Sequence, residues 1–112
     1  EPLNALQAIS KLCELAVVKI GIKGALIKQG DEVVHVGIMA AAKRVDTTGA
    51  GDFYAAGFLS GLCDGLSLRQ CGTIGAITAG KVIEVVGTTF GEEGWKDIHR
   101  LVNKVKNEKY LF

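Results

Sequence analysis

The chain has 112 residues, of which 48% are hydrophobic and 22% are charged, and its formal net charge is +1. This length predicts a single domain, and the apolar fraction is enough for a buried core. The near-neutral charge gives no argument for a nucleic-acid partner or an anionic membrane surface, and no apolar run long enough to cross a membrane is free of charge or glycine. The sequence starts with Glu1 rather than Met, which we interpret as a fragment or a processed chain.

Three cysteines, Cys13, Cys63 and Cys71, are an odd number and form no Cys-x-x-Cys pair. A disulfide framework or a zinc site would need pairs or histidine neighbours. We therefore predict reduced, buried thiols and a cytoplasmic location.

The first part of the chain predicts one helix followed by short strands. Apolar residues recur at every third position over residues 3–15, behind Pro2, which is typical of an amphipathic helix. Glycine-containing turns then separate β-branched, apolar segments, which predict strands over residues 16–20, 25–28 and 32–36 and a further strand ending at Val45.

The second part predicts three helices, over residues 50–63, 68–86 and 92–107. Small or apolar residues occur on nearly every side of the first, which favours a buried helix lying close on a sheet. Helices that follow strands in this way define an α/β fold with a small sheet covered by helices. The apolar strands need more cover than this chain supplies, so we expect the sheet to continue into a part that is absent here.

Residues 46–52 (Asp-Thr-Thr-Gly-Ala-Gly-Asp) join the two parts. Small side chains leave backbone N–H groups accessible, so a helix starting near Ala50 would offer an anion site at Gly49, Ala50 and Gly51. Asp52 would lie in the first helical turn beside that anion. An isolated Asp there usually stabilises the helix terminus by roughly 0.3–1 kcal/mol. A carboxylate that contacts a hydroxyl attacking a phosphate is the functional alternative, and the preceding glycines favour it.

A second glycine-rich stretch is a poorer candidate for a phosphate loop. Residues 75–82 nearly spell a P-loop, but Val82 replaces the required Ser or Thr and the segment has a helical pattern. We interpret its small residues as helix packing.

The motif at residues 46–52 resembles the signature of the ribokinase family, also called the PfkB family of sugar and nucleoside kinases, and the likeness extends over nearly the whole chain. It implies the C-terminal portion of a ribokinase-like Rossmann-type fold. Residues 82–89 look most similar to the adenosine-kinase-like branch. Enzymes of this family transfer the γ-phosphoryl group of ATP to a primary hydroxyl of a sugar or nucleoside, so the resemblance implies ATP, a small-molecule acceptor, Mg²⁺ and a K⁺ site.

The resemblance also implies residue roles. Asp52 corresponds to the base, and the amides of residues 49–51 hold the developing phosphate charge. Asp46 would help to form the monovalent-cation site, or it could simply be a turn acid. The residues implied in binding ATP are Gly21, Lys23, Gly24, Thr48 and Gly87. The turn that holds Gly21 and Gly24 could equally be a plain hairpin turn, and Lys23 a solvated turn residue.

Two departures from the family pattern weaken the expected activity. The Asn-x-x-Glu motif for Mg²⁺ does not occur, and Gly75-Ala76 stands where many relatives carry an Asn that approaches the base. The N-terminal two-thirds of the family, which carry that motif, the lid and most acceptor contacts, are missing, so we expect the fragment alone to be inactive while keeping half of a nucleotide site.

Other functional classes remain open. One is a non-catalytic module that binds a nucleotide or phosphate without transfer. An acyl hydrolase is a weaker alternative because no Gly-x-Ser-x-Gly motif provides a nucleophile. An oligomer is possible, and because apolar surface exposed by truncation could drive self-association, an oligomer of this chain need not be physiological.

Overall fold

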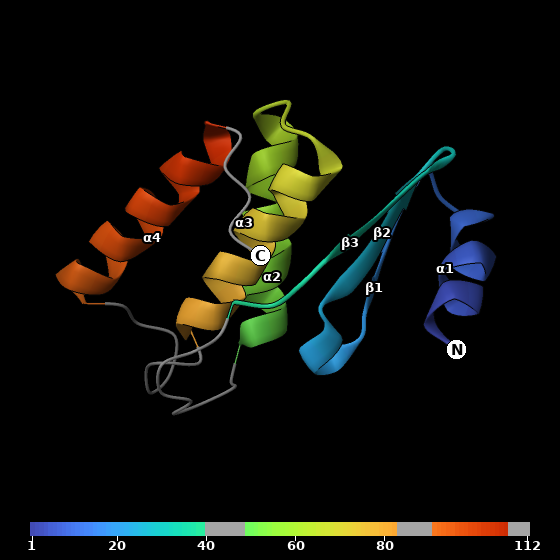
Figure 1. Ribbon diagram of the computed structural model, residues 1–112, viewed down its shortest axis with the longest axis horizontal. Coiled ribbons are helices and arrows are strands. Elements are labelled where there is room, and N and C mark those ends of the chain that lie inside the picture. The colour runs from blue at the N-terminus through green and yellow to red at the C-terminus, as the bar shows by residue number, and fades with distance from the viewer. Residues whose placement is uncertain (40–48, 83–90, 108–112) are drawn as a thin grey trace.

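The computed structural model describes residues 1–39, 49–82 and 91–107. The first stretch contains a helix, three strands and a short 3₁₀ helix, namely α1 (Pro2–Ser10), β1 (Leu15–Lys19), η1 (Gly21–Lys23), β2 (Ala25–Gln29) and β3 (Glu32–Val36). The other two stretches contain three helices, α2 (Ala50–Cys63), α3 (Leu68–Val82) and α4 (Glu92–Lys106). Figure 1 shows the sheet between α1 on one side and the α2–α3 pair on the other.

The three strands form an antiparallel sheet in the order β1-β2-β3. In its register Val17 lies opposite Ile27, which lies opposite Val34. Because side chains alternate along a strand, these three share one face, and they pack with Phe58 and Cys71 in the core. The sequence prediction of three short strands is confirmed, each within one residue of its predicted ends.

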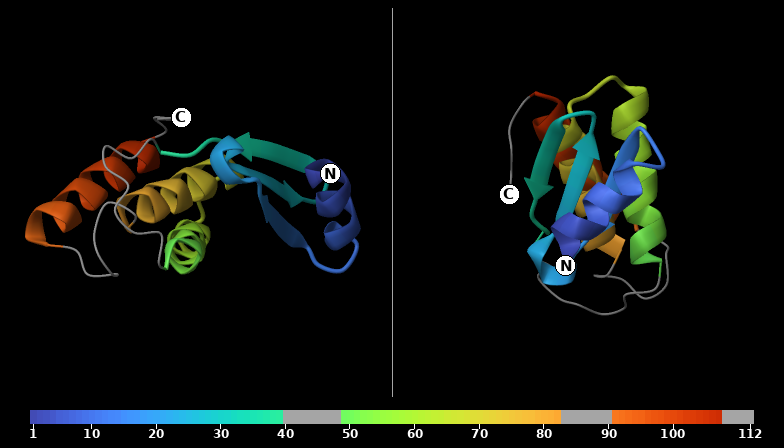
Figure 2. Two further views of the ribbon diagram at one scale, coloured as in Figure 1. Left: turned by 90° about the horizontal axis from the view of Figure 1, so that it is seen from below. Right: turned by 90° about the vertical axis from the view of Figure 1, so that its right-hand side faces the viewer.

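Helices α2 and α3 approach closely because small residues line their contact. A Cβ at Gly75 would stand only 3.0 Å from the carbonyl oxygen of Tyr54, and a Cβ at Gly61 only 3.1 Å from the sulfur of Cys71. The Thr78 hydroxyl donates to the carbonyl of Phe53 at 2.6 Å, which ties the start of α2 to α3. Helix α4 packs on the outer side of α3 (Figure 2).

The first predicted helix is shorter than its apolar pattern indicated. It ends at Ser10, because the chain must reverse within a few residues to enter β1 at Leu15. Only Leu6 of the predicted stripe is buried, since α1 covers β1 and β2 with one side, and Leu12 is 88% exposed. The periodic pattern therefore overestimated both the length of this helix and its burial.

Helix α2 is also less buried than its composition predicted. It packs against α3 through Gly57, Phe58 and Gly61, while Leu59 and Leu62 on other sides are exposed. The cysteine prediction is partly wrong. All three thiols are free, but only Cys71 is buried, whereas Cys13, beyond the end of α1, and Cys63, the last residue of α2, are exposed.

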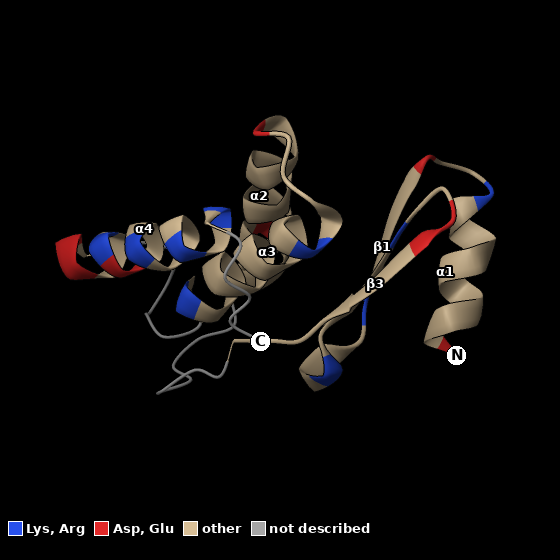
Figure 3. Ribbon diagram, turned by 45° about the horizontal axis from the view of Figure 1, so that its top comes forward, with Lys and Arg blue, Asp and Glu red and all other residues tan. Residues whose placement is uncertain are grey.

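Some predictions fall on residues that the structure does not describe. These are the strand ending at Val45 and the last residues of the helix predicted over 68–86. The charged residues of the described part concentrate along α4, whereas α1 carries almost none between its ends (Figure 3). No helix in the described ranges is long and apolar enough to span a membrane.

Candidate functional site

Helix α2 begins at the residue that the glycine motif predicted. Gly49 is its N-cap with φ 79°, a left-handed conformation that favours glycine, and no side chain caps the helix. The amide of Phe53 donates to the Gly49 carbonyl at 2.9 Å, which closes the first turn. The N–H groups at Ala50 and Gly51 precede this bond, so they are available to an anion. Asp52 lies in the same turn and is exposed.

The turn between β1 and β2 is a single turn of 3₁₀ helix rather than a simple hairpin turn. The Gly24 amide donates to the Gly21 carbonyl at 3.0 Å, and the Ile20 amide donates to the Gly24 carbonyl at 2.8 Å. Gly24 has φ 96°, and a Cβ at this position would overlap the carbonyl oxygen of Val36. Glycine is therefore required at Gly24 for both its conformation and its packing.

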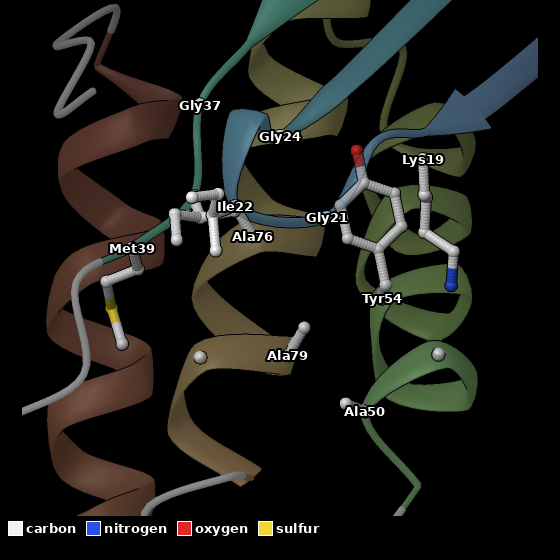
Figure 4. A pocket seen from close by; sticks show the side chains of 13 residues that line it. Lys19, Gly21, Ile22, Gly24, Gly37, Met39, Ala50, Tyr54, Ala76 and Ala79 are labelled. Carbon is white, nitrogen blue, oxygen red and sulfur yellow. The ribbon is translucent and has the colours of Figure 1, made fainter. Parts of the chain in front are cut away.

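These two glycine segments, which are far apart in the sequence, meet at one pocket. The pocket has a volume of about 360 Å³. Gly21 and Gly24 line it from the sheet side, and Ala50 and Gly51 line it from the start of α2 (Figure 4). The fold thus brings together the two segments that the sequence assigned to one nucleotide.

One end of the pocket carries positive charge that the sequence analysis missed. Lys19 is the last residue of β1, and its side chain points toward α2, since Val17 two positions earlier faces the core. Its Nζ lies 3.0 Å from where a Cβ would stand on Gly51, and 5.7 Å from the centre of the Tyr54 ring. The sequence contains a signal for this lysine. Side chains alternate along a strand, so Lys19 lies on the same face of β1 as the core residue Val17, where a lysine is unusual.

Tyr54 forms the pocket wall between Gly21 and Lys19 (Figure 4). Its hydroxyl is buried and has no hydrogen-bond partner in the part of the chain that the structure describes. Burial, together with an electrostatic interaction with Cys71, raises the pKa of Tyr54 to about 12. The phenol is therefore neutral at physiological pH, and its ring offers a face to the lysine ammonium.

The other end of the pocket is apolar. Ile22 and Met39 line it together with Ala76, Ala79 and Gly80 of α3. A Cβ at Gly80 would lie 2.7 Å from the Met39 methyl carbon, so this glycine serves close packing. The P-loop-like segment is therefore part of a helix, and its interpretation as helix packing is confirmed.

Other predicted site residues do not line this pocket or lie outside the described residues. Lys23 is exposed at the end of η1 and Asp52 is exposed beside the α2 start, and neither is among the residues that line the pocket. Asp46, Thr48 and Gly87 lie outside the described residues.

A pocket with this polarity suits a nucleotide. A phosphate group fits the end that combines a helix N-terminus with an ammonium group, and a planar base fits the apolar end. The fold and the pocket thus define an α/β protein with a pocket that is charged at one end and apolar at the other.

Comparison with known proteins identifies the family. The family model described as pfkB family carbohydrate kinase matches residues 1–94, and the chain belongs to this family. The nucleoside kinase of Methanocaldococcus jannaschii is 42% identical over 86 residues, which are 76% of this chain and 28% of that protein. The ribokinase of Arabidopsis thaliana is 40% identical over 101 residues, which are 86% of this chain and 27% of that protein.

Solved structures agree with this assignment. The adenosine kinase from Sinorhizobium meliloti has a TM-score of 0.76 and 36% identity, covering 95% of this chain and 30% of that one. Arabidopsis thaliana ribokinase complexed with ribose and ATP has a TM-score of 0.75 and 30% identity, covering 89% of this chain and 33% of that one. The chain therefore spans about a third or less of the relatives it matches, and its neighbours confirm the predicted ribokinase-type fold.

Proposed function

We propose that this chain forms the nucleotide-binding part of an ATP-dependent sugar or nucleoside kinase. The observation that carries the proposal is the pocket shared by the turn at Gly21 and Gly24 and the start of α2, in a chain of the pfkB family. ATP would lie with its base at the apolar end and its phosphates near Ala50 and Gly51. The acceptor is a primary hydroxyl of a small molecule, and the proposed location is the cytoplasm.

The proposed chemistry assigns Asp52 as the base that accepts the proton of the attacking hydroxyl. A carboxylate is a weak base for an alcohol, but phosphoryl transfer has a loose transition state in which positioning and charge stabilisation contribute most. The amides at Gly49, Ala50 and Gly51 would donate to the phosphate oxygens as negative charge develops on them. Asp52 is exposed beside the start of α2. This position would let its carboxylate reach the acceptor hydroxyl while the neighbouring amides donate to the phosphate.

The family resemblance implies Mg²⁺ and a monovalent cation such as K⁺ beside the nucleotide. No group of three or more His, Cys, Asp or Glu side chains gathers within residues 1–39, 49–82 and 91–107. A role for Asp46 at a monovalent cation, and roles for Thr48, Gly87 and Lys23 at the nucleotide, stay predictions.

The chain alone is proposed to be inactive, because it spans a third or less of its relatives and the acceptor must contact residues elsewhere. Measurable ATP-dependent transfer by the 112-residue chain would contradict this part of the proposal. The alternative function is a non-catalytic module that binds a nucleotide or phosphate at the same pocket.

Asp52→Asn distinguishes the two functions in the longest polypeptide that carries this chain. For a catalytic base, the turnover of ATP with a panel of sugars and nucleosides should fall by roughly 10²–10⁴-fold, while ATP affinity by calorimetry changes little. Asp31→Asn, in the exposed turn between β2 and β3, is the matched control and should leave both values unchanged. Unchanged turnover in Asp52→Asn would exclude Asp52 as the base. No transfer by the parent protein, with ATP bound equally well or better by the variant, would favour the binding module.

A further inference from the structure

The η1 turn lines the pocket without a buried side chain of its own. None of its three residues is buried, and Ile22 is 77% exposed. Gly21 at its start and Gly24 after its end have φ values of 64° and 96°, which glycine adopts easily and other residues rarely do. Burial of side chains therefore does not fix this turn, and its position depends on hydrogen bonds and on contacts of its backbone.

The end of the turn is held by β3. The Gly24 backbone lies so close to this strand that a Cβ there would overlap the carbonyl oxygen of Val36. The Gly24 amide also donates to the Gly21 carbonyl at 3.0 Å, which closes the turn. These contacts leave the carbonyl of Lys23, the last residue of η1, for another donor.

The His35 side chain provides that donor. His35 lies on β3, and its Nε2 is 2.5 Å from the Lys23 carbonyl oxygen. A carbonyl oxygen can only accept a hydrogen bond, so Nε2 carries the proton in this contact. Because Val34 and Val36 face the core, the His35 side chain lies on the opposite face of β3. The ring therefore holds the turn from the face of the sheet that is turned away from the core.

The backbone of His35 is itself held from two sides. It pairs with Leu26 in the register of β2 and β3. From the start of α3, the Arg69 guanidinium donates to the His35 carbonyl oxygen at 3.2 Å. The sheet and α3 thus fix the residue whose ring fixes the turn.

We propose that His35 is a positioning residue that holds η1 where Ile22 contacts the base of the bound nucleotide. This inference rests on the proposed function, which puts the base at the apolar end of the pocket. Ile22 lines that end together with Ala76 and Ala79 of α3 (Figure 4). Lys23 follows Ile22 directly, so a hydrogen bond to the Lys23 carbonyl restricts the backbone that carries the Ile22 side chain. His35 is not among the residues that line the pocket, and it acts through the turn.

A positioning role at the base end predicts a characteristic loss. AMP, ADP and ATP share the same base, so a weaker contact at Ile22 should lower the affinity for all three by the same factor. Loss of a phosphate contact would instead affect ATP most. If His35 served only the stability of β3, the folded protein would keep its nucleotide affinity after substitution.

Three substitutions separate these roles. His35→Leu removes the donor and leaves an apolar side chain in its place. His35→Gln keeps an N–H donor at nearly the same reach from the backbone as Nε2. Val33→Thr changes another exposed side chain on the same face of β3, two positions before His35, and is the matched control.

The test combines amide hydrogen exchange with calorimetry on the longest polypeptide that carries this chain. In His35→Leu, the Gly24 amide should exchange roughly threefold to tenfold faster than in the parent protein, the usual contribution of one hydrogen bond. The affinities for AMP, ADP and ATP should fall together by a similar factor. His35→Gln should recover most of both losses, and Val33→Thr should match the parent protein.

Four results would overturn the proposal: unchanged exchange at Gly24 in His35→Leu, unchanged nucleotide affinity in that variant, a loss confined to ATP, or equal losses in His35→Gln and His35→Leu. Binding and transfer by the parent protein test the proposed function separately. If the parent protein neither binds nucleotide nor transfers phosphate, that function fails, while faster Gly24 exchange in His35→Leu still supports His35 as the anchor of the turn. If the parent protein transfers phosphate and His35→Leu binds all three nucleotides equally well, the function stands and the inference about His35 fails.

Discussion

The glycines of α2 serve two different purposes on the same helix. At its start, a Cβ on Gly51 would meet, among the described residues, only the end of the flexible Lys19 side chain. Farther along, a Cβ on Gly57 would overlap the hydroxyl oxygen of Thr78 and stand 3.0 Å from the carbonyl of Ile74. The first glycine leaves backbone accessible to a ligand, and the second lets α2 approach α3. The comparison shows that a glycine-rich helix cannot be assigned to binding or to packing until its neighbours are known.

The largest expected effect is on stability, at Gly57 in the contact between α2 and α3. Gly57→Val should lower the free energy of unfolding by about 3 kcal/mol, because the new side chain enters a close-packed contact that has no room to relax. Urea denaturation followed by circular dichroism measures it. Gly37→Ala, at a residue with open space around the added Cβ and without a left-handed backbone conformation, is the control for introducing a side chain in place of glycine. Equal stability of Gly57→Val and the parent protein would mean that the α2–α3 contact is looser than described.

At Gly51, at the start of α2, a substitution should change ligand binding rather than stability. Gly51→Ala should keep the free energy of unfolding within about 1 kcal/mol of the parent value, since alanine is the better helix former. It should nevertheless weaken ATP binding, because its methyl group would occupy the space beside the Lys19 nitrogen. Denaturation and calorimetry on the same preparation check both parts. A variant that binds ATP as well as the parent protein would remove Gly51 from the proposed phosphate site.

The smallest expected effect is at the contact of α3 with α4, where a partly buried ion pair joins the two helices. The Lys81 ammonium lies 3.2 Å from the carboxylate of Asp97. This hydrogen bond and charge, with a smaller contribution from Arg100, lower the pKa of Asp97 below its usual range. A carboxylate with a lowered pKa stabilises the fold above its unfolded-state pKa, and this contribution is lost as the pH falls below about 4.

Stability measured between pH 6 and pH 2.5 checks this contribution. Asp97→Asn should show a slightly smaller loss of stability over the acid range than the parent protein. Identical pH profiles of the two proteins would show that the ion pair does not contribute to stability in solution.

Much of the fold could be predicted from the sequence because it depends on local patterns. The three strands, the start of α2 at Ala50 and the start of α3 at Leu68 all appeared where glycine turns and apolar spacing placed them. The left-handed conformation of Gly49 explains the first helix start, since few other residues adopt it readily. By contrast, the length and burial of α1 depended on where the chain had to reverse toward β1, and spacing alone does not carry that information.

The sequence by itself also determined the two glycine segments of the candidate site and the family to which they belong. Only the tertiary structure decided that these segments meet at one pocket, that Lys19 stands at its charged end, and that Tyr54 forms its wall. The physical reason is that a motif fixes the conformation of its own backbone through local sterics. The neighbours of that backbone come from β1 and α3, and their side chains reach it only once the sheet and the helices have packed.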